Sequence, residues 1–172
     1  MISEITKVAS VKLSAETLKR FDIEVAKYPA DHKESAVMAC LAIVQQEQGW
    51  VSGDAEKQIG EHLSMPAIAV REVTTFYNMY NQAPVGKYKL NVCTNLPCQL
   101  RDGQKALNHL CSKLGVDMGG TTADGMFTVQ QSECLGACAD SPVMLVNDRS
   151  MCSFMTNDKL DQLIGGLRSA TV

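Results

Sequence analysis

Residues 93–98 read CTNLPC and residues 134–138 read CLGAC, and these two stretches decide how the chain is interpreted. Each cysteine pair follows a segment with the side-chain pattern of a β-strand, so each pair is predicted in a loop at a strand end. Pro97 is expected to stiffen the first loop, and Gly136 to let the second backbone approach closely. Four thiols delivered by two loops can bind a metal centre from two sides.

The candidate ligands belong to an unusually large set of cysteines. The chain has seven, an odd number, and a reducing cytoplasm disfavours a scaffold of disulfides. Cys40 and Cys111 lie on apolar faces of predicted helices, and Cys152 lies on a predicted strand near Phe154, so we expect these three to be core residues. The four that remain as candidate metal ligands are Cys93, Cys98, Cys134 and Cys138.

A [2Fe–2S] cluster explains the four loop cysteines best, because each iron takes two thiolates. A structural zinc ion stays open as an alternative, although its cysteine pairs usually lie nearer together in the sequence. A dithiol redox site would need C-x-x-C, and a plant-type ferredoxin would need a third cysteine separated from Cys98 by two residues. A Rieske centre would need two histidines, and the three histidines fall on predicted helices away from these loops.

The cluster's surroundings can also be anticipated. We expect backbone N–H groups of residues 94–96 and 136–137 to donate hydrogen bonds to the sulfurs. Such bonds help to set a reduction potential, together with cluster charge and solvent exposure.

The first half of the chain is predicted to be a small helical bundle over residues 1–80. Its apolar residues recur with helical spacing, and Ser14, Pro29 and Gly49 supply start and stop signals. Ser52 begins a third helix. Ser64 is predicted to be the N-cap of a fourth helix, with Pro66 near its first turn, and this helix carries Val70, Val73, Tyr77 and Tyr80. Residues 81–87, NQAPVGK, lack periodicity and are predicted to be the linker.

The second half, residues 88–172, mixes strands and helices. The expected order is strand 88–92, a helix ending at Gly115, strands 126–130, 143–146 and 151–155, and a final helix capped by Thr156. Residues 147–150 are predicted to form the turn of a hairpin. A βα unit followed by a hairpin and a closing helix fits a small thioredoxin-type domain, so the fold class is α/β (α+β).

Composition excludes several functional classes. The 172 residues carry a formal net charge of −3, and the pI is near 5.6, which argues against nucleic acid as a partner. No apolar run approaches the roughly 20 residues of a membrane span. The first twenty residues lack the apolar stretch of a secretory signal. We therefore expect a cytoplasmic chain with no direct membrane insertion.

The residues resemble a known family. GKYKLNVCTNLPCQLRDG (86–103) and SECLGACADSPVMLVND (132–148) are similar to the thioredoxin-like [2Fe–2S] subunit of bacterial NADH-quinone oxidoreductase (respiratory complex I). SAVMACLAIVQQEQGWVS (35–52) and MPAIAVREVTTFYNMYNQAPVGKY (65–88) agree as well. The resemblance extends from about Tyr28 to about Leu167. It implies that the four loop cysteines are the cluster ligands and that Pro142 is the cis-proline often found in thioredoxin-like folds.

The resemblance also implies a function. The cluster would exchange single electrons with the FMN of a neighbouring NADH-binding flavoprotein subunit, with FMN and NADH on that partner. No nucleotide-binding glycine motif occurs in this chain, which agrees with the absence of an independent substrate site. The helical half would dock on the partner, and the chain would be peripheral to the inner membrane through the complex. Alternatives are a diaphorase subunit of a soluble NAD-linked hydrogenase or formate dehydrogenase, and a free-standing thioredoxin-like ferredoxin.

Overall fold

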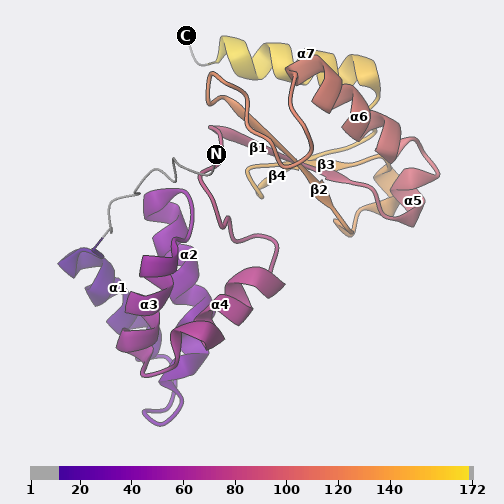
Figure 1. Cartoon of the computed structure of the whole chain (residues 1–172). Helices are drawn as coiled ribbons and strands as arrows, with labels where there is room; N and C mark the ends of the chain where they lie inside the picture. The colour runs from indigo at the N-terminus through magenta and orange to yellow at the C-terminus, as the bar shows by residue number, and fades with distance from the viewer. Residues whose placement is uncertain (1–11, 171–172) are drawn as a thin grey trace, which may run out of the picture. The chain divides into compact units, whose positions relative to one another are not determined.

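The computed structural model describes residues 12–170, and the chain divides into two compact units between Pro84 and Val85 (Figure 1). The first eleven residues of the predicted bundle and the last two of the predicted second domain lie outside the described residues. Each unit has its own apolar core. The predicted linker, residues 81–87, spans the boundary between the units.

The described part of the first unit is helical. Its elements are α1 (Ala15–Val25), a 3₁₀ turn (Lys33–Ala36), α2 (Val37–Gln48), α3 (Gly53–Leu63) and α4 (Ala67–Phe76). Ser14 caps α1 as predicted, since its hydroxyl accepts a hydrogen bond from Thr17 N–H. Ser52, predicted as the first residue of the third helix, is the N-cap of α3 and accepts from Ala55 N–H. The helices bury a core that includes Phe21, Leu41, Val44, Ile59 and Val70.

The prediction for the fourth helix was wrong at both ends. Ser64 is not its N-cap; it ends α3 in the left-handed conformation at φ 58°, and Pro66 precedes α4. Tyr80 lies beyond the end of α4, where its ring is buried and its hydroxyl donates to Met38 O at 2.9 Å. Gly60 permits the tight turn, since a Cβ there would lie 2.7 Å from the carbonyl oxygen of Met65.

The two ends of the predicted linker are ordered. Asn81 is buried, and its amide group donates to Gly49 O at 2.9 Å within the first unit. Gly86 N–H donates to Thr128 Oγ1 at 2.6 Å within the second unit. The stretch that joins the units is therefore shorter than the predicted linker.

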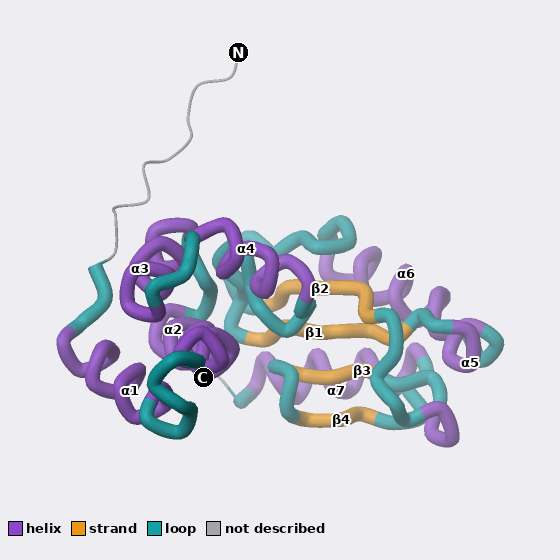
Figure 2. Tube along the Cα trace, turned by 90° about the horizontal axis from the view of Figure 1, so that it is seen from below, coloured by secondary structure: helices purple, strands orange, loops and turns teal. Residues whose placement is uncertain are grey.

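The second unit is an α/β domain. Its elements are β1 (Tyr88–Cys93), α5 (Leu96–Gln99), α6 (Gly103–Leu114), β2 (Phe127–Ser132), a 3₁₀ turn (Cys138–Asp140), β3 (Met144–Val146), β4 (Ser150–Cys152) and α7 (Asn157–Ser169). The strand order is β2-β1-β3-β4, with β1 parallel to β2 and antiparallel to β3. Figure 2 shows the strands side by side with α6 and α7 behind them. The predicted α/β class and order of major elements are confirmed.

The central strand β1 carries both apolar and polar buried residues. Leu90 and Val92 pack in the core beneath α6 and α7. Lys89 has a 3% exposed side chain, and its Nζ lies 2.5 Å from Asp148 Oδ2 in the β3–β4 hairpin. Asn147 and Asp148 both have φ of 53°, which asparagine and aspartate tolerate better than most residues. This contact between Lys89 and Asp148 fixes the β3–β4 hairpin against the N-terminal end of β1.

Candidate iron–sulfur site

Cys93 lies at the end of β1, where three segments of backbone converge. Its N–H donates to Val143 O at 3.1 Å, and the next amide, Thr94 N–H, donates to Ser132 O at 3.1 Å. The Cys93 thiol itself lies 3.2 Å from the carbonyl oxygen of Glu133. The cysteine is therefore held by the ends of β1 and β2 and by the chain that leads into β3.

Cys98 lies in the short helix α5 rather than in a loop, which corrects the predicted setting of the first pair. Pro97 occupies the first turn of α5, where a missing N–H costs nothing. Cys98 is 1% exposed, and it packs with Cys93 and Val143 in a small cluster separate from the main core of the unit. The four residues between Cys93 and Cys98 thus place their two buried thiols side by side.

Gly103 holds α6 against this pair, and the sequence analysis missed it. A Cβ at position 103 would lie 2.7 Å from Cys93 O and 2.9 Å from Cys98 O. Backbone atoms essentially never tolerate such a contact, so only glycine lets the start of α6 pack here. The signal was present as a single glycine five residues after Cys98, but glycine spacing alone does not reveal a close approach.

Cys134 and Cys138 are exposed at the surface of the second unit. Gly136 between them has φ of 74°, so glycine is needed for a left-handed turn. A Cβ on Gly136 would meet no protein atom within 4 Å, so the close approach of this backbone to a metal centre stays a prediction. The following Ser141–Pro142 peptide is cis, as the family resemblance implied.

The thiols influence one another. Burial raises the pKa of Cys93, and its contact with the Cys98 thiol raises it further, while the N–H groups of Asn95 and Leu135 oppose the rise. For Cys98, burial is outweighed by the Ser141 hydroxyl, the Val143 N–H and the Cys93 thiol, which together lower the pKa.

The second pair is coupled to the first. Desolvation raises the pKa of Cys138, followed by its interactions with Cys134 and with Cys98. Cys98 and Cys138 therefore link the buried pair to the exposed pair. Of the amide donors predicted from the sequence, Asn95 faces a sulfur; Leu135 and Val143, which also do, were not anticipated.

The donor set fits a binuclear iron–sulfur cluster. Within residues 12–170, no three His, Cys, Asp or Glu side chains converge closely enough to hold one metal ion. The four thiols lie instead as two interacting pairs, and a [2Fe–2S] cluster takes two thiolates on each iron. N–H groups that face the sulfurs supply the hydrogen bonds that such a cluster accepts.

Other candidate groups lie elsewhere. Cys40 is fully buried in the first core, whereas Cys111 and Cys152 are only half-buried against the second core, so the prediction of burial is right in part. His32 precedes the 3₁₀ turn rather than lying on a helix. His62 and His109 lie on α3 and α6 as predicted.

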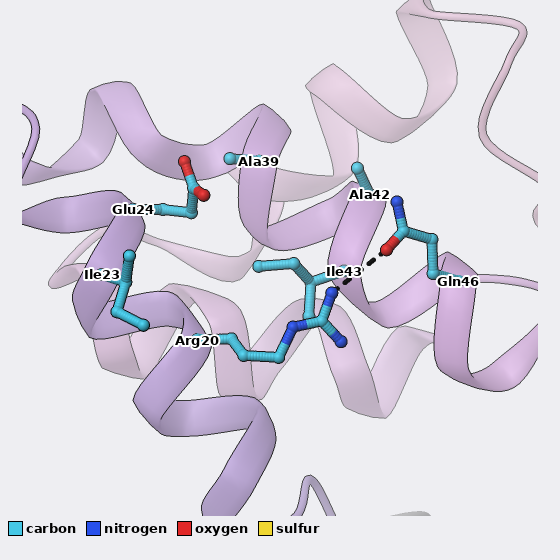
Figure 3. A pocket seen from close by; sticks show the side chains of 7 residues that line it. All are labelled: Arg20, Ile23, Glu24, Ala39, Ala42, Ile43 and Gln46. Atoms are coloured by element: carbon cyan, nitrogen blue, oxygen red, sulfur yellow. Dashed lines mark hydrogen bonds between the residues drawn. The ribbon is translucent and has the colours of Figure 1, made fainter.

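A groove of about 340 Å³ in the first unit lies between α1 and α2 (Figure 3). Arg20 reaches across it to Gln46 and Glu47, with distances of 3.1 and 2.6 Å. Its lining contains one carboxylate, Glu24, and no cysteine or histidine.

Comparison with known proteins decides the family. Residues 21–168 match the thioredoxin-like [2Fe-2S] ferredoxin family. The chain belongs to this family. Subunit 2 of NADH-quinone oxidoreductase from Thermus thermophilus is 38% identical over 144 residues, which cover 84% of this chain and 80% of the relative. A subunit of NADH-quinone oxidoreductase from Rickettsia conorii is 36% identical over 165 residues, covering 95% and 98% of the two chains. The resemblance drawn from the sequence is thereby confirmed.

A solved structure agrees on the fold alone. An NAD⁺-reducing [NiFe]-hydrogenase in its H₂-reduced state matches with a TM-score of 0.66 at 22% identity, covering 78% of this chain and 22% of that one. Among the helices formed by residues 12–170, none is long and apolar enough to cross a membrane.

Proposed function

We propose that this chain is the electron-transfer subunit of an NADH:quinone oxidoreductase (complex I), with one [2Fe–2S] cluster held by Cys93, Cys98, Cys134 and Cys138. The observation that carries the proposal is that Cys93 and Cys98 pack together and that their thiols contact the segment bearing the second pair, at Glu133 O and at the Ser141 hydroxyl, which donates to Cys138 O. Family membership and relatives named as subunits of NADH-quinone oxidoreductase support it. The NAD⁺-reducing hydrogenase alternative has only a likeness of fold in its favour.

The protein's own groups define how the centre would work. A bound [2Fe–2S] cluster supplies reversible one-electron chemistry. The N–H groups of Asn95 and Leu135 point their dipoles at Cys93, and Val143 N–H points at Cys98, so they favour added negative charge. Burial of this first pair excludes water from one side of the centre, while exposure of Cys134 and Cys138 leaves the other side accessible.

The electron partner in this proposal is the FMN of an NADH-binding flavoprotein subunit. FMN and NADH would be bound by that partner, since this chain has no nucleotide-binding glycine motif. Within such a complex the chain would sit peripherally on the inner membrane. The two names of the sequence relatives, both subunits of NADH-quinone oxidoreductase, support a multi-subunit setting.

The helical unit is proposed to dock on the flavoprotein. Ile68 and Phe76 are 67% and 80% exposed on α4, and their separation of eight residues places them about two turns apart on similar sides of the helix. Exposed aromatic and aliphatic side chains of this kind are typical anchors of an interface. Replacing both with serine should abolish co-purification with the flavoprotein, whereas the matched Met118→Ser in the second unit should not. Unchanged co-purification of the double variant would contradict this role for α4.

The cluster is tested by electron paramagnetic resonance on the anaerobically purified chain, with iron and acid-labile sulfide counted on the same sample. We expect about two iron ions per chain and a rhombic spin-half signal that develops only on reduction with dithionite. One zinc ion per chain without iron would instead make this a structural module and defeat the proposal.

A further inference from the structure

Ser141 is a buried hydroxyl between the two cysteine pairs. Ser141 as a whole is only 3% exposed to solvent. Its Oγ donates to the carbonyl oxygen of Cys138 at 2.6 Å, and the thiol of Cys98 donates to the same Oγ at 3.4 Å. A short series of hydrogen bonds therefore runs from Cys98 through Ser141 to the backbone of Cys138.

This series of hydrogen bonds cannot persist when Cys98 binds iron. A thiolate ligand has no proton to donate, so the Cys98 sulfur becomes an acceptor, and the serine loses the bond that it accepted. The single hydroxyl proton of Ser141 then has two acceptors within reach, a neutral carbonyl oxygen and a charged sulfur. Hydrogen bonds to a charged acceptor are about twice as strong as those between neutral groups.

Resting on the proposed function, we infer that Ser141 donates its hydroxyl hydrogen bond to the Cys98 sulfur in the cluster-bound chain and raises the reduction potential of the cluster. The bond strengthens when one electron from an external donor enters, because the sulfur then carries more negative charge. Ser141 acts through a ligand and is a positioning residue. Of the other groups that face this sulfur, Cys93 is itself a proposed ligand and Val143 contributes a backbone N–H, so Ser141 is the donor that a substitution can remove.

The test compares four full-length, cluster-loaded proteins: the wild type, Ser141→Ala, Ser141→Thr and Ser153→Ala. Threonine keeps the hydroxyl. Ser153→Ala is the matched control, because its hydroxyl donates to Asp140 Oδ2 at 2.9 Å in a neighbouring loop rather than to one of the four proposed ligands. Iron and sulfide are counted first. The midpoint potential is then measured by redox titration with the spin signal as readout, and pulsed resonance in D₂O detects the hydroxyl deuteron.

We expect Ser141→Ala to hold its cluster but to have an about tenfold lower ratio of reduced to oxidised cluster at the wild-type midpoint, a shift of about 59 mV to lower potential for one electron. Its deuteron coupling should disappear, while Ser141→Thr and Ser153→Ala should resemble the wild type. An unchanged midpoint potential in Ser141→Ala would overturn the inference. Loss of the cluster from this variant would overturn it too, because the role of the hydroxyl would then be to hold the Cys138 loop. Absence of iron and sulfide from the wild type would instead defeat the proposed function itself.

Discussion

Replacing Gly103 with alanine should damage the iron–sulfur site from outside it. The added Cβ would lie 2.7 Å from Cys93 O and 2.9 Å from Cys98 O, so these carbonyl groups or the start of α6 must retreat by about 0.7 Å to reach ordinary contact. Overpacking of this kind costs about 1–3 kcal/mol. Alanine regains up to about 1 kcal/mol through helix propensity. We expect a net loss of about 1–2 kcal/mol in the free energy of unfolding.

The assay is urea unfolding of the full chain followed by far-ultraviolet circular dichroism. A loss of this size moves the midpoint of the second unit by about 1 M urea. Trp50 is the single tryptophan and lies in the first unit, so its fluorescence should show an unchanged midpoint there. Iron per chain should fall, because the displaced carbonyls belong to two of the proposed ligands.

Gly165→Ala is the matched control, since a Cβ at this exposed position of α7 meets no atom within 4 Å. It should stabilise the protein by up to about 1 kcal/mol through reduced backbone entropy in the unfolded chain. If Gly103→Ala matched this control in both stability and iron content, the argument from close approach would be refuted.

Three further predictions rest on single side chains. Cys134→Ala should lose the iron and the reduced spin signal, whereas Cys111→Ala should keep both; retention in the first variant would remove Cys134 from the ligand set. Burial, with a smaller contribution from Glu24, raises the pKa of Cys40 to about 12 from the ordinary thiol value of 9.0. Between these two pH values the unfolded chain releases a proton that the folded chain keeps. The free energy of unfolding should therefore fall by about 1.4 kcal/mol per pH unit. Cys40→Val should lack this fall in stability when urea unfolding of the variant and of the wild type is measured at pH 8 and at pH 10.5. Asp148→Ala should remove the carboxylate that contacts the buried Lys89 ammonium and lower the stability of the second unit by about 2–3 kcal/mol, measured by urea unfolding.

Local signals were enough to predict most of the elements. Ser14, Ser52 and Thr156 cap helices because a serine or threonine hydroxyl satisfies a free N–H at the helix start, a rule that needs no tertiary information. Gly49 and Gly115 end helices in the left-handed conformation for an equally local reason. These contacts lie within a few residues of one another, so the sequence alone specifies them.

The errors arise where tertiary contacts decide. Ser64 had a local case for capping the fourth helix, but the close approach of α3 and α4 at Gly60 turns it into the end of the preceding helix. In the candidate site, the four cysteines were visible from spacing, while Gly103 and Ser141 were not. Each acts on a cysteine through atoms that only the folded chain brings within reach.

The second unit folds around a core that is separate from the candidate site. Leu90, Phe127 and Leu160 belong to a large apolar cluster, while Cys93 and Cys98 belong to a small one with Val143. In a zinc finger, metal binding supplies the folding free energy, because the chain has almost no other core. Here the sheet and its two helices have one, and the backbone bonds that hold Cys93 in place join strand ends. Loss of the cluster should therefore leave the fold intact, which is why the ligand variants can test function apart from stability.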